Sequence, residues 1–443
     1  MKTKSFLVFI ILFFFDRGFA QYPPNTISLE SSNLPILVIN TSGQNIQDEP
    51  KITANLSLIN NSILPNHPTD SGNIYTGLIG IELRGSSSLS YPKKSFAFEL
   101  RDSGGDDLDL SILGMASESD WSLISNWVDR SLIKNALIYK MYEDIHDGYA
   151  VKTRFCEVIL NDIHIGVYLL TEKIKRSKNR LDINKLKDSE LSGEDLTGGY
   201  IVKNDNLSGT GNSFYWFSIN EYTGNKPFIV QYPKPDNLQT EQFNYIKKYF
   251  YDFETALNSN SFMDPLTGYS RFINVQSFVD YFWIQEFSRN TDGFRGSVYF
   301  SKDKNKKLYI GPIWDFDESF RYNYFCSNRL DGWLHEGDCR NDAFLFWWSR
   351  LREDCEFGNL AESRFEELSS SVFNNIYVAH KVDSFQTLLQ SAAYRDEQIW
   401  DLDHYFIQET NFIKTFCSQR LTWLNSNYRN VNRSKPSSIN VSN

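Results

Sequence analysis

The period of the hydrophobic pattern changes along this chain of 443 residues, and that change constrains the fold more than any other feature of the sequence. In the first part, short apolar runs are separated by Gly, Asn and Pro turns, which predicts a sheet. The runs that we expect to form strands are 36–39, 79–83, 95–100, 155–160 and 166–170. The last two flank an Asn-Asp turn and should form a hairpin.

Helical spacing of apolar residues dominates later in the chain. Asp129 can cap a helix over about 132–141, and the other predicted helices are one that starts at Thr240, one at 277–288, and helical stretches at 341–370 and 384–425. The sequence therefore predicts an α+β fold with a sheet-rich N-terminal half, a helix-rich C-terminal half and a site at their junction.

The N-terminus has the pattern of a secretory signal peptide, because Lys2 and Lys4 precede the apolar run from Phe6 to Phe15. We expect the mature protein to be secreted, either extracellular or at the cell surface, and no later stretch is apolar for long enough to predict a membrane span. The predicted divisions are 1–20 (signal peptide), 21–206 (sheet-rich part), 207–268 (connecting segment with one helix), 269–426 (helix-rich part) and 427–443 (polar tail, expected to be disordered).

Net charge and cysteine content limit the classes of function that are compatible with the sequence. The net charge of −10 makes nucleic acid a poor partner. The chain has five cysteines, so at least one is unpaired, and their spacing matches no zinc pattern. Four of them lie in the last third, which leaves room for one or two disulfides in an oxidising compartment.

Carboxylates follow apolar elements in the segment 289–320. Asp292 comes after the predicted helix, and Asp315 and Asp317 come after the apolar strand 308–313. A hairpin between them would bring Asp292 close to Asp315, and a divalent cation would relieve the repulsion between carboxylates in a poorly hydrated place. The alternative is that Asp315 and Asp317 only cap backbone amides.

A loop of small residues follows Arg84. Ser87 and its neighbours can present backbone amides and hydroxyls to phosphate oxygens, and Lys93 or Lys94 adds positive charge. Strand alternation puts the two lysines on opposite faces and does not decide between them. The alternative is an exposed loop followed by two surface lysines.

Two further segments carry candidate polar groups. Glu172 ends an apolar strand, where an ionised carboxylate needs a partner such as a lysine from the small-residue loop, although it could equally open the next segment. Arg130 and Asn135 lie at a helix start that could face a nucleotide, or they could serve capping alone. No pattern suggests a Ser-His-Asp hydrolase, and the six histidines show no metal-ligand spacing.

Taken together, these segments resemble the CotH family of atypical protein kinases, because seven blocks occur in the family's order. The blocks are 34–52, 80–100, 113–137, 157–183, 197–206, 290–303 (NTDGFRGSVYFSKD) and 308–320 (LYIGPIWDFDESF). The resemblance covers roughly 34–206 and 272–364. It implies a divergent protein-kinase-like, two-lobed fold that transfers the γ-phosphoryl group of ATP to Ser or Thr of secreted or surface proteins.

The resemblance also implies roles for single residues. Asp292 and Asn290 of the NTDG motif match the catalytic segment, with Asp292 orienting the acceptor hydroxyl or sharing the metal, and Asp315 with Asp317 would hold Mg²⁺ or Mn²⁺. The predicted nucleotide contacts are Lys93 or Lys94 at the phosphates, Glu172 holding that lysine, and Arg84, Ser87, Arg130 and Asn135 around them.

Two departures keep other functions open. The glycine-rich loop and His-Arg-Asp motif of ordinary kinases are absent, so their rules transfer only by analogy. The first rival is a catalytically silent surface or adhesion protein that binds a partner, and the second is a glycoside hydrolase that uses Asp292 and Asp315. A role in the spore coat belongs to some family members and does not follow for this chain.

Overall fold

The computed structural model describes residues 22–207, 214–220, 226–320, 330–336 and 345–430. The predicted signal peptide, 1–20, lies outside the described residues. Within them, no helix is long and apolar enough to cross a membrane. Cys156, Cys355 and Cys417 are free, while Cys326 and Cys339 fall outside the described part of the chain.

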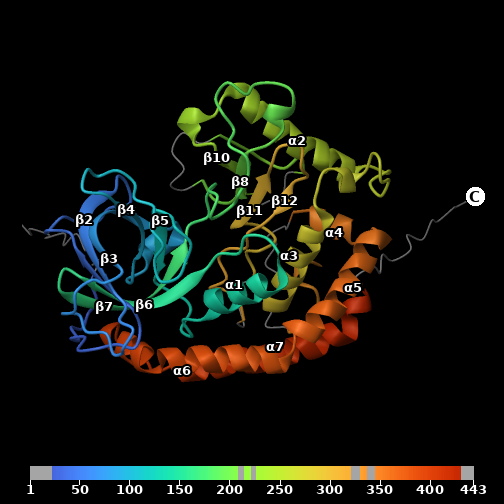
Figure 1. Ribbon diagram of the computed structural model, residues 1–443. Coiled ribbons are helices and arrows are strands. Elements are labelled where there is room, and N and C mark those ends of the chain that lie inside the picture. Colours follow the sequence, from blue (N-terminus) through green and yellow to red (C-terminus); the bar gives the residue numbers. More distant parts are fainter. Residues whose placement is uncertain (1–21, 208–213, 221–225, 321–329, 337–344, 431–443) are drawn as a thin grey trace, which may run out of the picture.

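The N-terminal half forms a closed barrel of seven strands in the order β1-β2-β3-β4-β5-β7-β6 (Figure 1). Neighbouring strands are antiparallel except β1 and β6, which are parallel and close the barrel. The strands are β1 (Ile36–Asn40), β2 (Ile52–Ile59), β3 (Tyr75–Arg84), β4 (Ser95–Arg101), β5 (Asp120–Ile124), β6 (Thr153–Leu160) and β7 (Ile163–Glu172). The predicted strands are therefore confirmed, but sequence periodicity did not indicate that they close into a barrel.

A second sheet combines strands from both halves of the chain, in the order β12-β11-β8-β10-β9. These strands are β8 (Tyr200–Asn204), β9 (Tyr215–Trp216), β10 (Phe228–Tyr232), β11 (Val298–Lys302) and β12 (Tyr309–Ile310). The connecting segment 207–268 thus supplies two strands besides its helix. The predicted hairpin between Asp292 and Asp315 is present as the antiparallel pair β11–β12.

The helices gather beside this sheet and below the barrel (Figure 1). They are α1 (Lys134–Ile145), α2 (Thr240–Asn258), α3 (Val275–Ser288), α4 (Trp347–Leu351), α5 (Cys355–Ser371), α6 (Asn375–Ile399) and α7 (Phe406–Asn427), with 3₁₀ turns at 87–90, 194–197, 235–237, 269–271, 334–336 and 428–430. The helical stretch predicted at 384–425 is two antiparallel helices that break at 400–405, and the polar tail predicted from residue 427 begins inside the end of α7.

Aromatic side chains fill the core between the second sheet and the helices. Phe228 of β10 stacks on Trp347 of α4 with ring centroids 5.5 Å apart, and Phe253 of α2 meets the same indole edge-on at 4.8 Å. Helix α3 is buried on every side from Ser277 to Ser288, so it forms the centre of the helical part. The chain that leaves α3 therefore starts from a rigid position.

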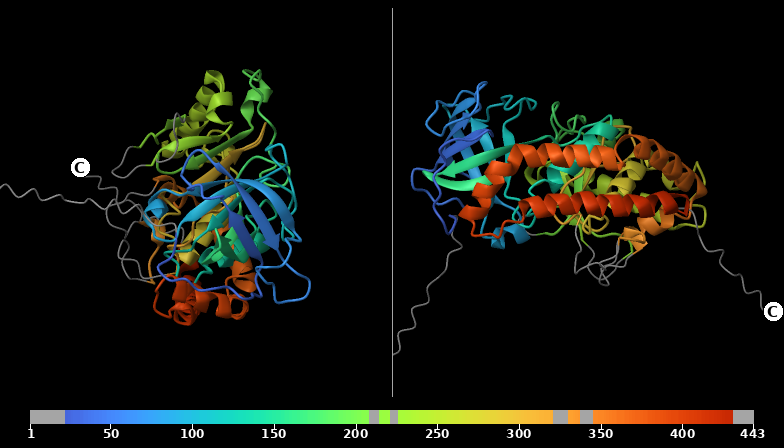
Figure 2. Two further views of the ribbon diagram at one scale, coloured as in Figure 1. Left: turned by 90° about the vertical axis from the view of Figure 1, so that its left-hand side faces the viewer. Right: turned by 90° about the horizontal axis from the view of Figure 1, so that it is seen from below.

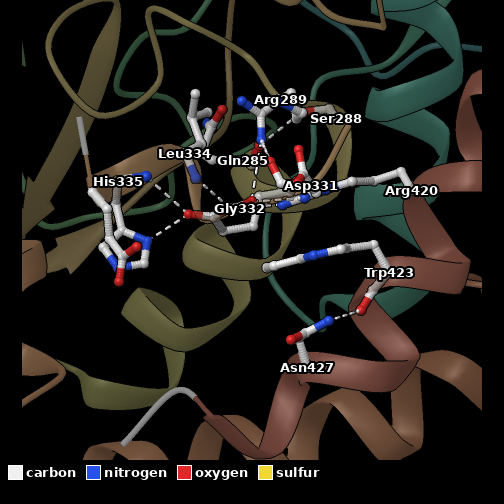
Figure 3. Close-up of polar contacts among 12 residues, drawn as sticks. Gln285, Ser288, Arg289, Asp331, Gly332, Leu334, His335, Arg420, Trp423 and Asn427 are labelled. Carbon is white, nitrogen blue, oxygen red and sulfur yellow. Dashed lines mark hydrogen bonds and ion pairs between the residues drawn. The ribbon is translucent and has the colours of Figure 1, made fainter. Parts of the chain in front are cut away.

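A buried ionic network fixes the end of α3. Glu286 is fully buried, and its carboxylate accepts from Arg420 Nη2 of α7 at 2.9 Å and from His335 Nδ1 at 2.5 Å. Arg420 and Arg289 both donate to the backbone carbonyl of Gly332, and Figure 3 shows these side chains converging on that segment. Burial alone would raise the pKa of Glu286, but the charge of His335 and its hydrogen bonds, together with the charge of Arg420, lower this pKa to about 2. The network joins α3, α7 and residues 330–336.

We predict that Glu286→Gln lowers the free energy of unfolding by about 3–5 kcal/mol at pH 7, because it leaves Arg420 buried without its counter-charge. In the unaltered protein, the ionised Glu286 contributes its full stability above about pH 4.5, and this contribution is lost as pH falls toward 2. The Glu286→Gln variant should therefore not show the loss of stability that protonation of Glu286 causes in the unaltered protein. Thermal melting against pH measures both effects.

The matched control is Asp252→Asn, which removes an exposed ion pair with Lys248 on α2. This change should alter stability by no more than about 0.5 kcal/mol. Equal melting temperatures for Glu286→Gln and the control would contradict the role given to the network.

Candidate functional site

A polar cleft of about 610 Å³ lies between the barrel and the second sheet. The barrel side is formed by residues 82–88, Tyr91, Ser95, Ala97, 124–127 and Lys173, and the opposite side by Lys203, Asp205, Thr291, Asp292, Arg295, Ser297, Tyr299, Trp314, Asp315, Asp317 and Glu318. The remaining lining residues are Asn135 and Tyr139 of α1, Asp48, Glu49, Asn206 and Gln231. The cleft therefore lies at the junction of the two halves, where the sequence predicts a site.

Asp315 is held in an uncommon backbone conformation. Its φ of 67° lies in the left-handed region, which non-glycine residues seldom occupy. Three side chains hold it there: Asn290 Nδ2 donates to the Asp315 carbonyl at 3.1 Å, the Asp315 amide donates to the Tyr139 hydroxyl at 3.2 Å, and the Ser297 hydroxyl donates to Asp315 Oδ2 at 2.9 Å. Such conformations persist where the surroundings over-determine them, and they concentrate at functional sites.

Helix α1 fixes the next two residues. The Phe316 amide donates to Asn135 Oδ1 at 2.8 Å, and Lys134 Nζ donates to the carbonyl of Asp317 at 3.2 Å. Asp129 accepts from the Lys134 amide at 2.9 Å, so it supports the start of α1, although the helix begins five residues after it. Asn135 thus lines the cleft as predicted and also positions the Asp315 segment.

The carboxylates of the cleft repel one another. Burial raises the pKa of Asp315 to about 6, and the negative charge of Asp292 adds to this effect. Burial and the charge of Asp315 also raise the pKa of Asp317. Asp292 forms an ion pair with Arg295 at 3.0 Å, yet its charge still acts on Asp315. The meeting of Asp292 and Asp315 in one cleft, predicted from the sequence, is therefore present.

This donor set fits a hard divalent cation. In the described residues no group of three or more His, Cys, Asp or Glu side chains is arranged to hold a metal. Mg²⁺ at nucleotide sites takes one or two carboxylates, and waters and substrate phosphates complete its octahedron. Asp315 and Asp317 supply such a pair, and burial together with neighbouring negative charge raises the pKa of both, so a bound cation would stabilise their ionised forms.

The small-residue loop also reaches the cleft. Arg84 and Ser87 both line it, and the Arg84 guanidinium lies 5.2 Å from the centre of the Trp314 ring. Gly85 has a φ of 125°, and a Cβ there would lie 1.8 Å from Ser88 Oγ, so the turn requires glycine. The placement of Arg84 and Ser87 agrees with the sequence prediction.

Lys93 and Lys94 lie outside the lining of this cleft. Lys94 Nζ donates to the carbonyls of Leu89 at 2.8 Å and Tyr91 at 2.7 Å, so it supports the loop from behind. Lys93 is buried and pairs with Asp396 of α6 at 2.6 Å. Because Asp396 is 303 residues away, no local pattern indicates this partner.

Glu172 and Arg130 also have other neighbours than expected. Glu172 is buried and pairs with Arg180 at 3.0 Å, instead of with a lysine from the loop. Arg130 packs over Trp127 at 4.4 Å and faces a small separate cavity beside α6. Neither Glu172 nor Arg130 therefore lines the cleft.

The lysines that do line the cleft are Lys173 and Lys203. Lys173 directly follows Glu172, the last residue of β7, and no motif in the sequence singles it out. Lys173 Nζ lies 3.6 Å from Asp120 Oδ1, and Lys203 Nζ lies 3.8 Å from Asp205 Oδ2. Both distances exceed a hydrogen bond, so neither ammonium group is tightly held.

The fold and the cleft define a class. This is an α+β protein with a barrel, a second sheet built from both halves of the chain and, between them, a cleft lined by both carboxylates and basic side chains. The CotH kinase protein family model matches residues 81–424, so the chain belongs to the CotH family. That membership suggests a kinase-like function. No curated protein matches the sequence.

We predict that Asp315→Asn raises the melting temperature of the nucleotide-free protein at pH 7. The pKa of Asp315 in the folded protein, about 6, exceeds the usual value near 3.9, so stability falls as pH rises through this interval. Asparagine removes this penalty, so the free energy of unfolding should rise on the order of 1 kcal/mol, and this gain should disappear below about pH 4. Thermal melting across pH 3–8 measures it.

The companion variant is Asp292→Asn, which removes the nearby negative charge and should lower the pKa of Asp315. Carbon-detected NMR titration of the aspartate carboxyl groups reports that value directly. A destabilised Asp315→Asn variant, together with an unchanged Asp315 pKa in Asp292→Asn, would show that the two carboxylates do not interact.

Proposed function

We propose that this protein is a kinase that transfers the γ-phosphoryl group of ATP to Ser or Thr hydroxyls of proteins, with ATP bound in the cleft. The observation that carries the proposal is the placement of Asp315 and Asp292 opposite the cationic groups of Arg84 and Lys173 in a single polar cleft. Phosphoryl transfer requires positioning and charge stabilisation more than covalent participation by the protein, so this charge arrangement suits it.

The carboxylates of the cleft have different roles in this proposal. Asp315, with Asp317, would hold Mg²⁺ or Mn²⁺, which neutralises the charge of the phosphates when it is bound. Asp292 orients the acceptor hydroxyl and accepts its proton, and the Arg295 ion pair sets the position of that carboxylate. Asn290 acts indirectly, because it holds the Asp315 backbone.

The basic side chains contact the phosphates. Arg84, on the barrel wall, has a guanidinium suited to paired phosphate oxygens, and Lys173 and Lys203 offer ammonium groups from the two sides. These three replace Lys93 and Lys94, which are engaged elsewhere. Burial lowers the pKa of Lys173, and the positive charges of Lys51 and Arg84 add to this effect, so a polyphosphate bound beside Lys173 and Arg84 would relieve their repulsion.

The divergent kinase-like, two-lobed architecture and secretion belong to the same proposal. The barrel would serve as the lobe that covers the nucleotide, and the helical part as the lobe that carries the catalytic carboxylates. The signal-peptide pattern at residues 1–20 supports secretion, so acceptors would be secreted or surface proteins. The rival that remains is a silent family member that only binds a partner.

The test measures ATP binding and transfer separately. With Mg²⁺, ATP should raise the melting temperature, and label from γ-labelled ATP should pass to a Ser/Thr-containing acceptor protein or to the chain itself. Lys203→Met should weaken ATP binding about tenfold or more, since a charge-assisted hydrogen bond contributes about 1.5–3 kcal/mol. Asp292→Asn should keep ATP binding and lose transfer.

Lys248→Met is the matched control, because Lys248 is an exposed lysine on α2 and should leave both readouts unchanged. Binding of ATP without transfer to any acceptor would favour the silent rival. Absence of binding in the unaltered protein would overturn the proposal, and cleavage of sugar oligomers would favour the hydrolase.

A further inference from the structure

The α6–α7 hairpin runs along one side of the molecule, from the barrel to the helical part (Figure 2). At the barrel end, two successive α6 residues of opposite charge form ion pairs. Arg395 pairs with the buried Glu157 of β6, and Asp396 pairs with the buried Lys93 at 2.6 Å. Alternating charges of this kind fix both the position and the direction of the helix on the barrel.

The Asp396 contact is tightly built. Its Oδ1 accepts from Lys93 Nζ at 2.6 Å and from the Val167 amide of β7 at 2.8 Å. Gly166 allows this approach, because a Cβ there would lie 2.0 Å from the same oxygen. Trp400, at the end of α6, donates from Nε1 to the Ile165 carbonyl at 3.1 Å. The helix end is therefore fixed by both charge and backbone contacts.

This contact lies directly behind the barrel wall of the candidate site. Residues 125–127 line the cleft on one side and the small cavity beside Asp396 on the other. Trp127 meets Trp400 edge-on, with ring centroids 5.7 Å apart. Lys93 adjoins Lys94, which holds the cleft loop of residues 84–91.

The other end of the hairpin reaches the opposite wall. Arg420 of α7 donates to the Glu286 carbonyl at 3.0 Å and pairs with its carboxylate, four residues before Asn290. Tyr377 of α6 donates to Asp144 at the end of α1, the helix that holds the Asp315 segment. One helical hairpin thus contacts the supports of both cleft walls.

We propose that the α6–α7 hairpin is a clamp that sets the distance between the two walls of the cleft, and that Asp396 is the positioning residue at its barrel end. Asp396 touches neither wall's lining groups and acts through Lys93 and residues 125–127. Of the two measurements below, only ATP binding rests on the proposed function, and hydrogen exchange without nucleotide does not.

The test uses Asp396→Asn in the full chain, with Trp400→Phe as a milder variant that keeps the aromatic contact and loses the donor. Amide hydrogen exchange without nucleotide should increase about tenfold at 84–91 and 124–127, while β8 and α3 stay unchanged. The dissociation constant for ATP with Mg²⁺ should rise about tenfold, the size of a typical coupling between sites, with little change in transfer at saturating ATP.

Asp383→Asn is the control, because it removes the exposed Lys414–Asp383 pair within the same hairpin and should change nothing. Exchange that increases uniformly over the chain, or not at all, would overturn the clamp. If Asp396→Asn does not fold, Trp400→Phe decides by the same local pattern. If the unaltered protein does not bind ATP, the proposed function fails, but the exchange result still decides the clamp.

Discussion

The backbone of residues 315–317 is held by hydrogen bonds from two distant parts of the chain, and the candidate site depends on this constraint. Asn290 fixes the Asp315 carbonyl, while Asn135 and Lys134 of α1 fix the two residues that follow. Without them, two carboxylates with raised pKa values would move apart, since their mutual repulsion favours separation. The fold therefore keeps negative charge concentrated in the cleft, and this arrangement lowers the stability of the folded protein.

The network around Glu286 extends the same constraint into the core. It fixes the end of α3, from which the chain passes through Arg289 to Asn290 and Asp292. Arg289 has a φ of 48° and closes α3 by donating its amide to the Gln285 carbonyl. Asn290, which holds Asp315, and Glu286, which fixes the end of α3, are thus both buried in the core. This burial explains how an unfavourable cluster of carboxylates can persist.

Local pattern predicted the strands of the barrel, most helices and the meeting of Asp292 with Asp315, because a hairpin and alternating apolar runs are short-range features. It also placed Arg84, Ser87 and Asn135 at the cleft. Closure of the barrel and the pairing of Lys93 with Asp396 depend on contacts between residues far apart, for which one sequence gives no signal. Glu172 and Arg130 contact near neighbours in the chain, Arg180 and Trp127, but the apolar pattern carries no signal for such side-chain contacts. Lys173 was not predicted because no motif or spacing distinguishes it from the other charged residues that follow the strand.

The central claim is that Asp315 and Asp317 bind a metal–nucleotide complex whose phosphates lie between Arg84, on the barrel side of the cleft, and Lys203, on the opposite side. Its most direct test is a crystal structure with Mn²⁺ and a non-hydrolysable ATP analogue, in which the anomalous signal locates the metal. The account predicts a peak within coordination distance of the Asp315 carboxylate, with phosphates toward Arg84 and Lys203. A nucleotide bound outside the cleft, or a metal held away from Asp315 and Asp317, would contradict it.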